Sequence, residues 1–496
     1  MDKKKAEIRN RILIKKLNLY KKLVIQTIIY FIGSIFPKII NYAFLKFFTK
    51  SLRREEFSLY TDMYALSFLV IGFLSFGLEN TYFRFLSKKD HNKEVVFQQA
   101  FCPIFDNFFF LIFSVNSIKY LVSIAGYKNH PEYFFMFFLI IFFDTICILP
   151  MAWLRANEMA LKYTTINVIN ILLQSSMIIY MFSFYPQKIL FFFYFELVNS
   201  FTDKTGYIFF ANMISSLSNF LLITPILFKK VTIKKFNKIL AKKMLNYGIP
   251  IMLGTIAFSI NENLDKILIK RWLSDEINGA YSACYKIASF MSLYIRAFRL
   301  GIEPFFLKNL KMLMQNILRK ITYFFIIFGL IFYVLICGNL SILIEFLIDK
   351  KYHLAISIIP IVMMGNLFLG IYTNLSIFYK IIDKPIIGTY ISLVGVLITI
   401  LFNIVFILIP HSSFMIPAWG TLASYGSMVL VLYFWGKKNF LKFCIKTWNI
   451  VLHLLFALFL VGYMVNHENR IEISIFLQFL YVIIVFLFEK NNLKNK

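Results

Sequence analysis

Long apolar runs separated by short polar gaps repeat from one end of the chain to the other. Most runs exceed about 18 residues, enough for a helix to cross roughly 30 Å of hydrocarbon. No long segments of alternating polarity indicate a membrane barrel. The pattern predicts an all-α, polytopic membrane protein with fourteen transmembrane helices, and a short apolar stretch at 189–200 that lies at the interface or packs on the bundle. The helices are expected at 24–45, 58–86, 97–126, 133–154, 163–184, 206–228, 246–269, 277–307, 320–346, 352–378, 385–409, 415–436, 443–465 and 470–489.

The helix starts repeat with a constant offset. Helices one to five begin near 24, 58, 97, 133 and 163, and helices seven to eleven each begin about 220 residues later, which indicates an internal duplication. Two six-helix lobes are expected, related by a pseudo-two-fold axis along the membrane normal. The predicted parts are an N-lobe at 1–228, a basic cytoplasmic linker at 229–243, a C-lobe at 244–437, and helices thirteen and fourteen with a cytoplasmic tail at 438–496.

Composition agrees with a membrane protein. Hydrophobic residues make up 59% of the 496 positions, and the mean hydropathy is +0.71. The five cysteines form no CxxC pair and lie mostly inside apolar runs, so neither a disulfide nor a metal site is expected. The first apolar run lacks a small-residue cleavage pattern, which favours a retained helix over a signal peptide.

The net charge of +28 raises the question of nucleic-acid binding. Lys and Arg concentrate in the gaps between apolar runs, which is the topology signal of a membrane protein, so no nucleic-acid partner is expected. With the N-terminus inside, the inside gaps carry most of these residues. An even number of helices then places both termini in the cytoplasm.

The first helix of each half contains a Gly/Pro interruption. Gly33 and Pro37 lie in FIGSIFPKII, and Gly248 and Pro250 lie in YGIPIMLGT. Matching breaks in corresponding helices favour hinges beside a central site. Close helix packing through small residues is the alternative interpretation.

Helix eight carries charges where a lipid-facing helix would not. A charge at the bilayer centre costs about 2.5 to 3.5 kcal/mol, yet YIRAFRLGIEPFF holds Arg296, Arg299 and Glu303 on one face. Lys286 lies on the same broad side. Such a face must look into the bundle or a water-filled cavity, and guanidinium groups bind phosphate oxygens with a planar fork. Glu303 follows Arg299 by one turn and is expected to hold it in place.

Other intramembrane charges leave two interpretations open. Lys38 and Arg84 add positive charge, although Arg84 is near enough to the cytoplasmic end to snorkel to headgroups. Asp265 and Lys266 are candidates for a gate or for an interfacial ion pair. The acids either neutralise the bases or take up H⁺ or Na⁺. The full set of gate or ion-coupling candidates is Glu79, Asp144, Glu262, Asp265, Lys266 and Glu303.

Several blocks resemble a known family. They are GLENTYFRF at 77–85, FFDTICILPMAWLRANEMALKY at 142–163, NENLDKILIKRWL at 261–273, AYSACYKIASFMSLYIRAFRLGIEPFF at 280–306 and, more weakly, AWGTLASYGSMVLVLYF at 418–434. In order and spacing they resemble Wzx-type polysaccharide flippases of the multidrug/oligosaccharidyl-lipid/polysaccharide exporter superfamily. The resemblance covers helices one to twelve, and no block is a catalytic signature.

The resemblance implies a flippase of the bacterial inner membrane that moves undecaprenyl-pyrophosphate-linked oligosaccharide for surface polysaccharide such as O-antigen or capsule. Its partners would be this lipid-linked glycan, membrane lipids, a coupling H⁺ or Na⁺, and a polysaccharide polymerase. Glu262, Asp265 and Lys266 would lie at an outer gate, and Arg155 at a helix end would be structural. The implied substrate-binding residues are Arg84, Lys286, Arg296 and Arg299.

Two other function classes stay open at the level of sequence. A drug or cation antiporter of the same superfamily would need an acidic or apolar cavity. A polysaccharide polymerase or ligase would need larger outer loops than this chain offers. P-loop, HExxH and GxSxG motifs are absent, so no enzyme activity and no cofactor are expected.

Overall fold

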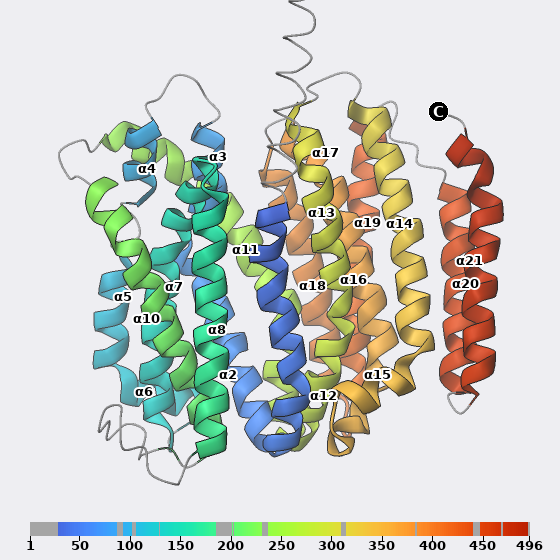
Figure 1. The fold of residues 1–496 in the computed structure, drawn as a ribbon, viewed down its shortest axis with the longest axis horizontal. Coiled ribbons are helices and arrows are strands. Elements are labelled where there is room, and N and C mark those ends of the chain that lie inside the picture. Colours follow the sequence, from blue (N-terminus) through green and yellow to red (C-terminus); the bar gives the residue numbers. More distant parts are fainter. Residues whose placement is uncertain are drawn as a thin grey trace, which may run out of the picture.

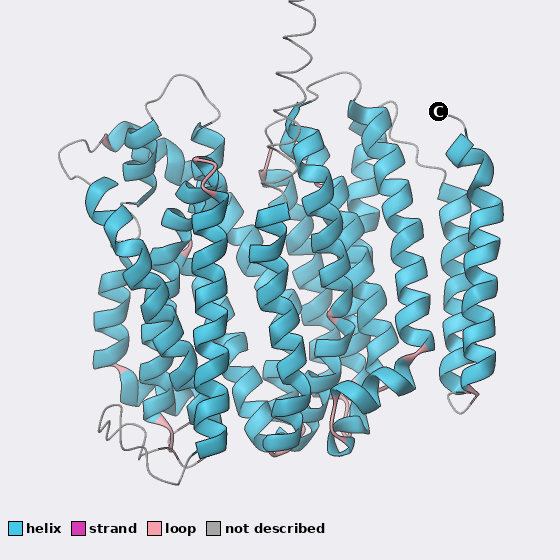
Figure 2. Cartoon of the chain, in the orientation of Figure 1, coloured by secondary structure: helices cyan, strands magenta, loops and turns pink. Residues whose placement is uncertain are grey.

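The computed structural model describes residues 28–86, 93–101, 106–127, 129–184, 201, 203–230, 237–308, 314–381, 384–439, 447–467 and 470–494. Within these ranges the chain is helical apart from turns and one short 3-10 segment, and it contains no strand (Figure 2). The all-α prediction is confirmed. The apolar stretch at 189–200 and the basic N-terminus at 1–22 lie outside the described residues.

Helices long and apolar enough to cross a membrane number twelve in the described part of the chain, or thirteen if the bent pair of α5 (Asp106–Asn116) and α6 (Ile118–Ala125) forms one span. The remaining predicted helix, 277–307, corresponds to α12 (Asp275–Ala288) and α13 (Phe290–Lys308), whose charged residues lower its hydropathy. Fourteen spans therefore stay a prediction. The other elements on the N-terminal side are Ile28–Ser51 (the first helix), α2 (Arg54–Leu74), α3 (Leu78–Leu86), α7 (Pro131–Ala156), α8 (Ala160–Phe184) and α10 (Thr205–Lys230).

The helices after the basic linker form the C-terminal half. Its elements are α11 (Lys238–Trp272), α14 (Met314–Gly338), α15 (Leu340–Leu347), the 3-10 segment η3 (Lys350–Ala355), α16 (Ile358–Leu375), α17 (Ile377–Ile381), α18 (Ile386–Leu408), α19 (Met415–Asn439), α20 (Thr447–Asn466) and α21 (Ile471–Lys494). Figure 1 shows α3, α4 and α17 at one end of the bundle, which we call the linker face, and α6, α12 and α15 at the other, which we call the opposite face.

Several helices predicted as continuous are interrupted. The predicted helix at 97–126 consists of α4 (Lys93–Phe101) followed by α5 (Asp106–Asn116) and α6 (Ile118–Ala125), which meet at an angle of 80°. Helix 277–307 breaks at Ser289, and helix 320–346 breaks at Asn339. At both breaks the side chain bonds the backbone carbonyl four residues earlier, Tyr285 in one case and Leu335 in the other. Such side-chain bonds compete with the backbone hydrogen bonds of the helix. They do not lower the hydropathy of the segment, so the apolar pattern does not reveal the break.

The basic linker is shorter than predicted. The expected loop spans 229–243, but α10 continues to Lys230 and α11 begins at Lys238. Asn237 caps α11 by accepting a hydrogen bond from the backbone N–H of Leu240 at 3.1 Å. Lysines at solvated helix ends are compatible with helix, so charge alone did not mark the boundary.

The first helix bridges the two halves. Near its start, the Thr164 hydroxyl of α8 donates to the carbonyl of Ile29 at 2.8 Å. Near its end, Leu45, Phe48 and Leu52 belong to the same apolar cluster as the core of the C-terminal half, and the Lys46 ammonium donates to the carbonyl of Glu345 at 2.8 Å. An element that leads the N-lobe in sequence therefore packs on the C-lobe at the opposite face.

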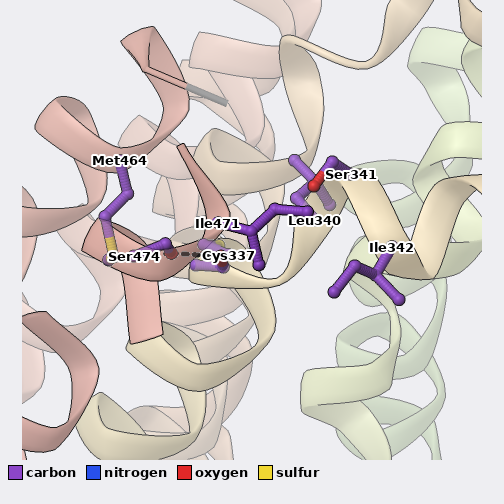
Figure 3. A pocket seen from close by; sticks show the side chains of 8 residues that line it. Cys337, Leu340, Ser341, Ile342, Met464, Ile471 and Ser474 are labelled. Carbon is purple, nitrogen blue, oxygen red and sulfur yellow. Dashed lines mark hydrogen bonds between the residues drawn. The ribbon is translucent and has the colours of Figure 1, made fainter. Parts of the chain in front are cut away.

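Helices α20 and α21 attach to the C-lobe through α14 (Figure 1). At one end, the hydroxyl of Tyr323 donates to Glu489 at 2.6 Å, and buried His453 lies 3.4 Å from the same carboxylate. At the other end the amide of Asn339 donates to Gln478 of α21 at 2.8 Å. A small cavity beside this contact (Figure 3) is lined by Cys337, Gly338, Leu340, Ser341, Ile342, Met464, Ile471 and Ser474. The extra pair is thus an appendage of one lobe.

Glycines allow the lobes to approach closely at both ends of α2. A Cβ on Gly279 of α12 would overlap the carbonyl oxygen of Arg54, at the start of α2. Near the other end, Phe76 and Gly77 adopt left-handed φ values of 48° and 62°, and a Cβ on Gly77 would lie 2.6 Å from the carbonyl oxygen of Gly248. Backbone meets backbone at these two contacts, which fix how the lobes sit in this conformation.

We expect Gly279→Ala to destabilise the protein by about 1 to 3 kcal/mol, the usual cost of overpacking. The matched control is Gly462→Ala on α20, where an added Cβ meets nothing within 4 Å. That change should be neutral or stabilising by about 0.5 to 1 kcal/mol, because alanine favours helix. Thermal unfolding of the two purified variants in detergent measures the difference. Equal midpoints would contradict the close lobe contact.

Candidate functional site

Two arginines on α13 have accessible side chains. Arg296 and Arg299 are both exposed. Among the side chains that the structure describes, neither makes an ion pair or a hydrogen bond. Glu303, the predicted partner of Arg299, lies on α13 beyond the last residue whose side chain is described, so that pairing stays a prediction. The accessible positive charge of helix eight is therefore not neutralised by any described acid.

Arg296 faces the N-terminal half. It interacts electrostatically with Tyr163 of α8 and with Tyr42 of the first helix, besides its neighbour Arg299. The first helix adds Lys38, which lies within electrostatic range of Arg296 and of Glu262. Since these residues come from both lobes, Arg296 looks into the space between them rather than at lipid. We call Lys38, Arg296 and Arg299 the inter-lobe cations.

Lys286 lies elsewhere on the lobe boundary. Its ammonium donates to the hydroxyl of Tyr60 at 3.2 Å and lies 4.5 Å from the centre of that ring and 5.1 Å from the ring of Phe57. Both aromatic residues belong to α2, near the opposite face. The break at Ser289 separates Lys286 from Arg296, so the single polar face expected for helix eight is divided in two.

A polar network joins the lobes at the opposite face. Asp62 of α2 is completely buried and accepts a hydrogen bond from Arg271 of α11 at 3.0 Å, and a second from the hydroxyl of Tyr127. Burial and the charge of Asp62 raise the pKa of Tyr127, so this hydroxyl stays protonated and remains a donor. Lys270 donates to Tyr127 at 2.7 Å and pairs with Asp275 at 3.2 Å.

Neutral groups extend this network along α2 and α12. The hydroxyl of Ser58 donates to Asp275 at 2.8 Å, and the amide of Asn278 donates to Ser58 at 2.9 Å. These two bonds cross between the N-terminal and C-terminal halves, as do the bonds from Arg271 to Asp62 and from Lys270 to Tyr127. We call the network the opposite-face clamp, formed by Ser58, Asp62, Tyr127, Lys270, Arg271, Asp275 and Asn278.

Sequence reasoning missed the clamp. Asp62 lies inside the predicted helix 58–86, in LYTDMYAL, so an acid within an apolar run was a sufficient signal. Arg271 and Lys270 fall at a helix end, where a basic residue is unremarkable. Only the fold brings Asp62 and Arg271 together across more than two hundred positions.

The predicted gate residues on α11 instead contact the C-lobe. Glu262 accepts a hydrogen bond from the hydroxyl of Tyr425 at 2.8 Å, and Asp265 accepts one from Tyr281 at 2.6 Å. The ammonium of Lys266 lies 3.4 Å from Asp265 and 3.4 Å from the centre of the Tyr285 ring. In this conformation these acids tie α11 to α12 and α19. Their gate and ion-coupling roles stay predictions.

The remaining candidates lie in the N-terminal half. Glu79 forms an ion pair with Arg155 at the end of α7, and Arg84 lies half-buried further along α3. Asp144 lies inside the N-lobe, with Ser216 of α10 as a hydrogen-bond partner and Tyr64 nearby. Both of these neighbours of Asp144 belong to the N-terminal half.

The predicted hinge residues occupy contact points. Gly33 packs directly on Thr164, and Gly248 packs on the carbonyl of Phe76. Both helices continue through their prolines, Pro37 and Pro250. The carbonyl of Pro250 accepts a hydrogen bond from Thr389 at 2.6 Å. Close packing is therefore observed, and bending stays a prediction.

Solved structures share this fold over most of the chain. The lipid II flippase MurJ in an inward closed conformation aligns with a TM-score of 0.66 and 16% identity, covering 95% of this chain and 99% of MurJ. The MATE multidrug transporter DinF-BH, solved as a complex, aligns with a TM-score of 0.58 and 16% identity, covering 84% of this chain and 95% of DinF-BH. A mutant of the Vibrio cholerae MATE transporter VcmN gives a TM-score of 0.57 and 13% identity, covering 86% and 99% of the two chains. At these identities the likeness shows the fold.

The chain therefore shares its fold with a lipid II flippase and with MATE transporters. A sequence search of curated proteins gives no match. The profile of the family described as "Polysaccharide biosynthesis protein" matches residues 23–309, more than half of the chain. The chain belongs to the polysaccharide biosynthesis protein family.

Proposed function

We propose that the chain is a flippase that moves a polyprenyl-diphosphate-linked oligosaccharide, of the undecaprenyl type, across the bacterial inner membrane. The observation that carries the proposal is the pair Arg296 and Arg299, exposed and without a described acidic partner on a helix inside the bundle. A diphosphate bears about two negative charges and accepts bidentate hydrogen bonds from guanidinium groups. The fold of the lipid II flippase and the polysaccharide biosynthesis family support the same substrate class.

The proposed mechanism is alternating access. We take the linker face as the cytoplasmic side, in agreement with the positive-inside pattern, and the glycan head group enters there while the lipid tail stays in the bilayer. The opposite-face clamp closes the other end, as Asp62 and Arg271 do in this conformation. Rocking of the lobes then breaks the clamp and exposes the head group outside. An ion gradient or the membrane potential drives the cycle, since one charge crossing 100 mV is worth about 2.3 kcal/mol.

The other two function classes have less support. A cation exporter needs accessible acids, but Glu262 and Asp265 are hydrogen-bonded to tyrosines of the C-lobe. A polymerase or ligase needs catalytic groups at the outer face, whereas the charged residues of the clamp are paired with one another there. A polysaccharide polymerase remains a partner that would receive the flipped unit.

The test is depletion of the chain from its host, followed by analysis of lipid-linked glycans. We expect complete diphosphate-linked repeat units to accumulate on the cytoplasmic side while surface polysaccharide falls. Fluorescent dye efflux should be unchanged. Dye sensitivity with intact surface glycan would instead establish the cation exporter, and accumulation of flipped but unpolymerised units would establish the polymerase.

A further inference from the structure

The ion pair of Arg155 and Glu79 has an unusual setting for a structural pair. Arg155 lies in the last turn of α7 and Glu79 in the first turn of α3, and their side chains are 34% and 41% exposed. The guanidinium also lies 5.2 Å from the centre of the Phe83 ring and 5.7 Å from that of Tyr163. Two aromatic rings therefore fix the position of the cation while solvent still reaches the ion pair.

The same aromatic group links Arg155 to the inter-lobe cations. Tyr163 interacts electrostatically with Arg296 of the C-lobe while its ring contacts Arg155 of the N-lobe. Tyr30 of the first helix packs edge-on against Tyr163 with ring centres 5.5 Å apart, and it interacts electrostatically with Arg155. Tyr163 is thus within electrostatic range of Arg296 in the C-lobe and in ring contact with Arg155 in the N-lobe.

We propose that Arg155 is the N-lobe's diphosphate-binding residue and that Glu79 is its resident counter-ion, which the diphosphate displaces. The inference rests on the proposed function. A diphosphate has two phosphoryl groups, and guanidinium forks from opposite lobes can each take one. When no diphosphate is bound, Glu79 neutralises Arg155, which limits the electrostatic cost of an arginine whose aromatic neighbour Tyr163 also interacts with Arg296.

Glu79 lies close to the contact between the lobes at Gly77 and Gly248, so its displacement by a diphosphate can affect that contact. Glu79 lies two residues after the left-handed turn at Phe76 and Gly77, and that turn meets the backbone of Gly248 on α11. Release of Glu79 removes the ion pair that ties this turn to α7. Substrate binding then loosens one of the two close backbone contacts between the lobes. The exchange of Glu79 for a diphosphate thereby shifts the equilibrium between the two arrangements of the lobes.

The test compares opposite partners of one ion pair. Full-length protein in nanodiscs is titrated with inorganic pyrophosphate by calorimetry at pH 7.5. Glu79→Gln should bind pyrophosphate about 3- to 10-fold more tightly, because the competing carboxylate charge is gone. Arg155→Gln should bind at least about 10-fold more weakly, and Arg155→Lys should fall between. Removing either partner of a purely structural pair would lower thermal stability and move binding in the same direction.

Matched controls and a lipid arm complete the design. Glu472→Gln and Arg470→Gln change the same residue types at exposed positions at the end of the appended pair, and both should bind like the parent chain. Repeating the titration in nanodiscs with and without phosphatidylglycerol separates a diphosphate site from a general anionic-lipid site. The tighter pyrophosphate binding of Glu79→Gln should appear in both kinds of nanodisc. If Glu79→Gln binds pyrophosphate like the parent chain in nanodiscs without phosphatidylglycerol, the inference is overturned.

The outcomes also separate this inference from the proposed function. If Arg296→Gln and Arg299→Gln lose pyrophosphate binding while Glu79→Gln and Arg155→Gln stay within twofold of the parent, Arg155 and Glu79 are structural and the flippase proposal stands. If the parent chain itself does not bind pyrophosphate, both proposals fail. Opposite shifts in the two variants support both.

Discussion

Replacing Arg296 and Arg299 together by alanine is expected to lower flipping at least 100-fold while the protein still folds and reaches the membrane. Hydrogen bonds to charged groups contribute about 1.5 to 3 kcal/mol each, and about 1.4 kcal/mol corresponds to a factor of ten. Because both side chains are exposed and make no described hydrogen bond or ion pair, their removal should not destabilise the bundle. Translocation of a fluorescent polyprenyl-diphosphate glycan in proteoliposomes measures the loss.

Lysine substitutions sharpen this result. Lysine keeps the charge but lacks the planar fork, so the double lysine variant should retain part of the activity. Arg470→Ala, at an exposed position beside α21, should flip at the parent rate. Normal flipping in the double alanine variant at normal membrane level would remove both arginines from the mechanism.

The second large effect is expected at the opposite-face clamp. Asp62→Asn leaves Arg271 and Tyr127 without the carboxylate to which both donate hydrogen bonds. Breaking a buried pair costs about 3 to 5 kcal/mol, and the lower end applies because Arg271 keeps 30% of its side chain exposed. Since the clamp exists only while this end is closed, the variant should shift the population toward the state open at the opposite face.

Cysteine labelling measures that shift. In a Ser282→Cys background, at a buried α12 position that contacts Thr61 of α2 outside the clamp, a membrane-impermeant maleimide applied from the outside should react at least about tenfold faster after Asp62→Asn, with the native cysteines giving the background rate. That factor corresponds to about 1.4 kcal/mol, well within the cost of the broken pair. The double change Asp62→Asn with Arg271→Gln removes both charges and should recover part of the closed population. Identical labelling rates in all variants would show that the clamp does not close this end.

The apolar runs were enough to predict nearly every helix, because a helix that crosses the membrane needs about twenty mostly apolar residues. It did not locate the breaks at Ser289 and Asn339, since side-chain bonds to the backbone leave hydropathy unchanged. It also overestimated the linker, because Lys238 and Lys242 are as acceptable on a solvated helix end as in a loop.

The site was predictable to a different extent. An uncompensated arginine in an apolar run is visible in one dimension, so Arg296 and Arg299 could be identified. The sequence does not show which side chain each charged residue contacts in the fold. Glu262 and Asp265 were candidates for a gate, yet tyrosines of α19 and α12 are their partners. Arg155 was assigned a structural role from its helix-end position, and only the fold brings Arg296 within electrostatic range of Tyr163, whose ring centre lies 5.7 Å from Arg155.

The bridging position of the first helix has a consequence for biosynthesis. The Lys46 ammonium bonds a carbonyl 299 positions later, and the Tyr352 hydroxyl donates to the carbonyl of Leu52 across 300 positions. At a synthesis rate of about 5 to 20 residues per second, these partners leave the ribosome roughly 15 to 60 seconds after the first helix. During that time the helix sits in the bilayer without its final neighbours. Maturation of the leading half must therefore wait for translation of the trailing one, and a ribosome stalled before Glu345 should leave the end of this helix open to protease.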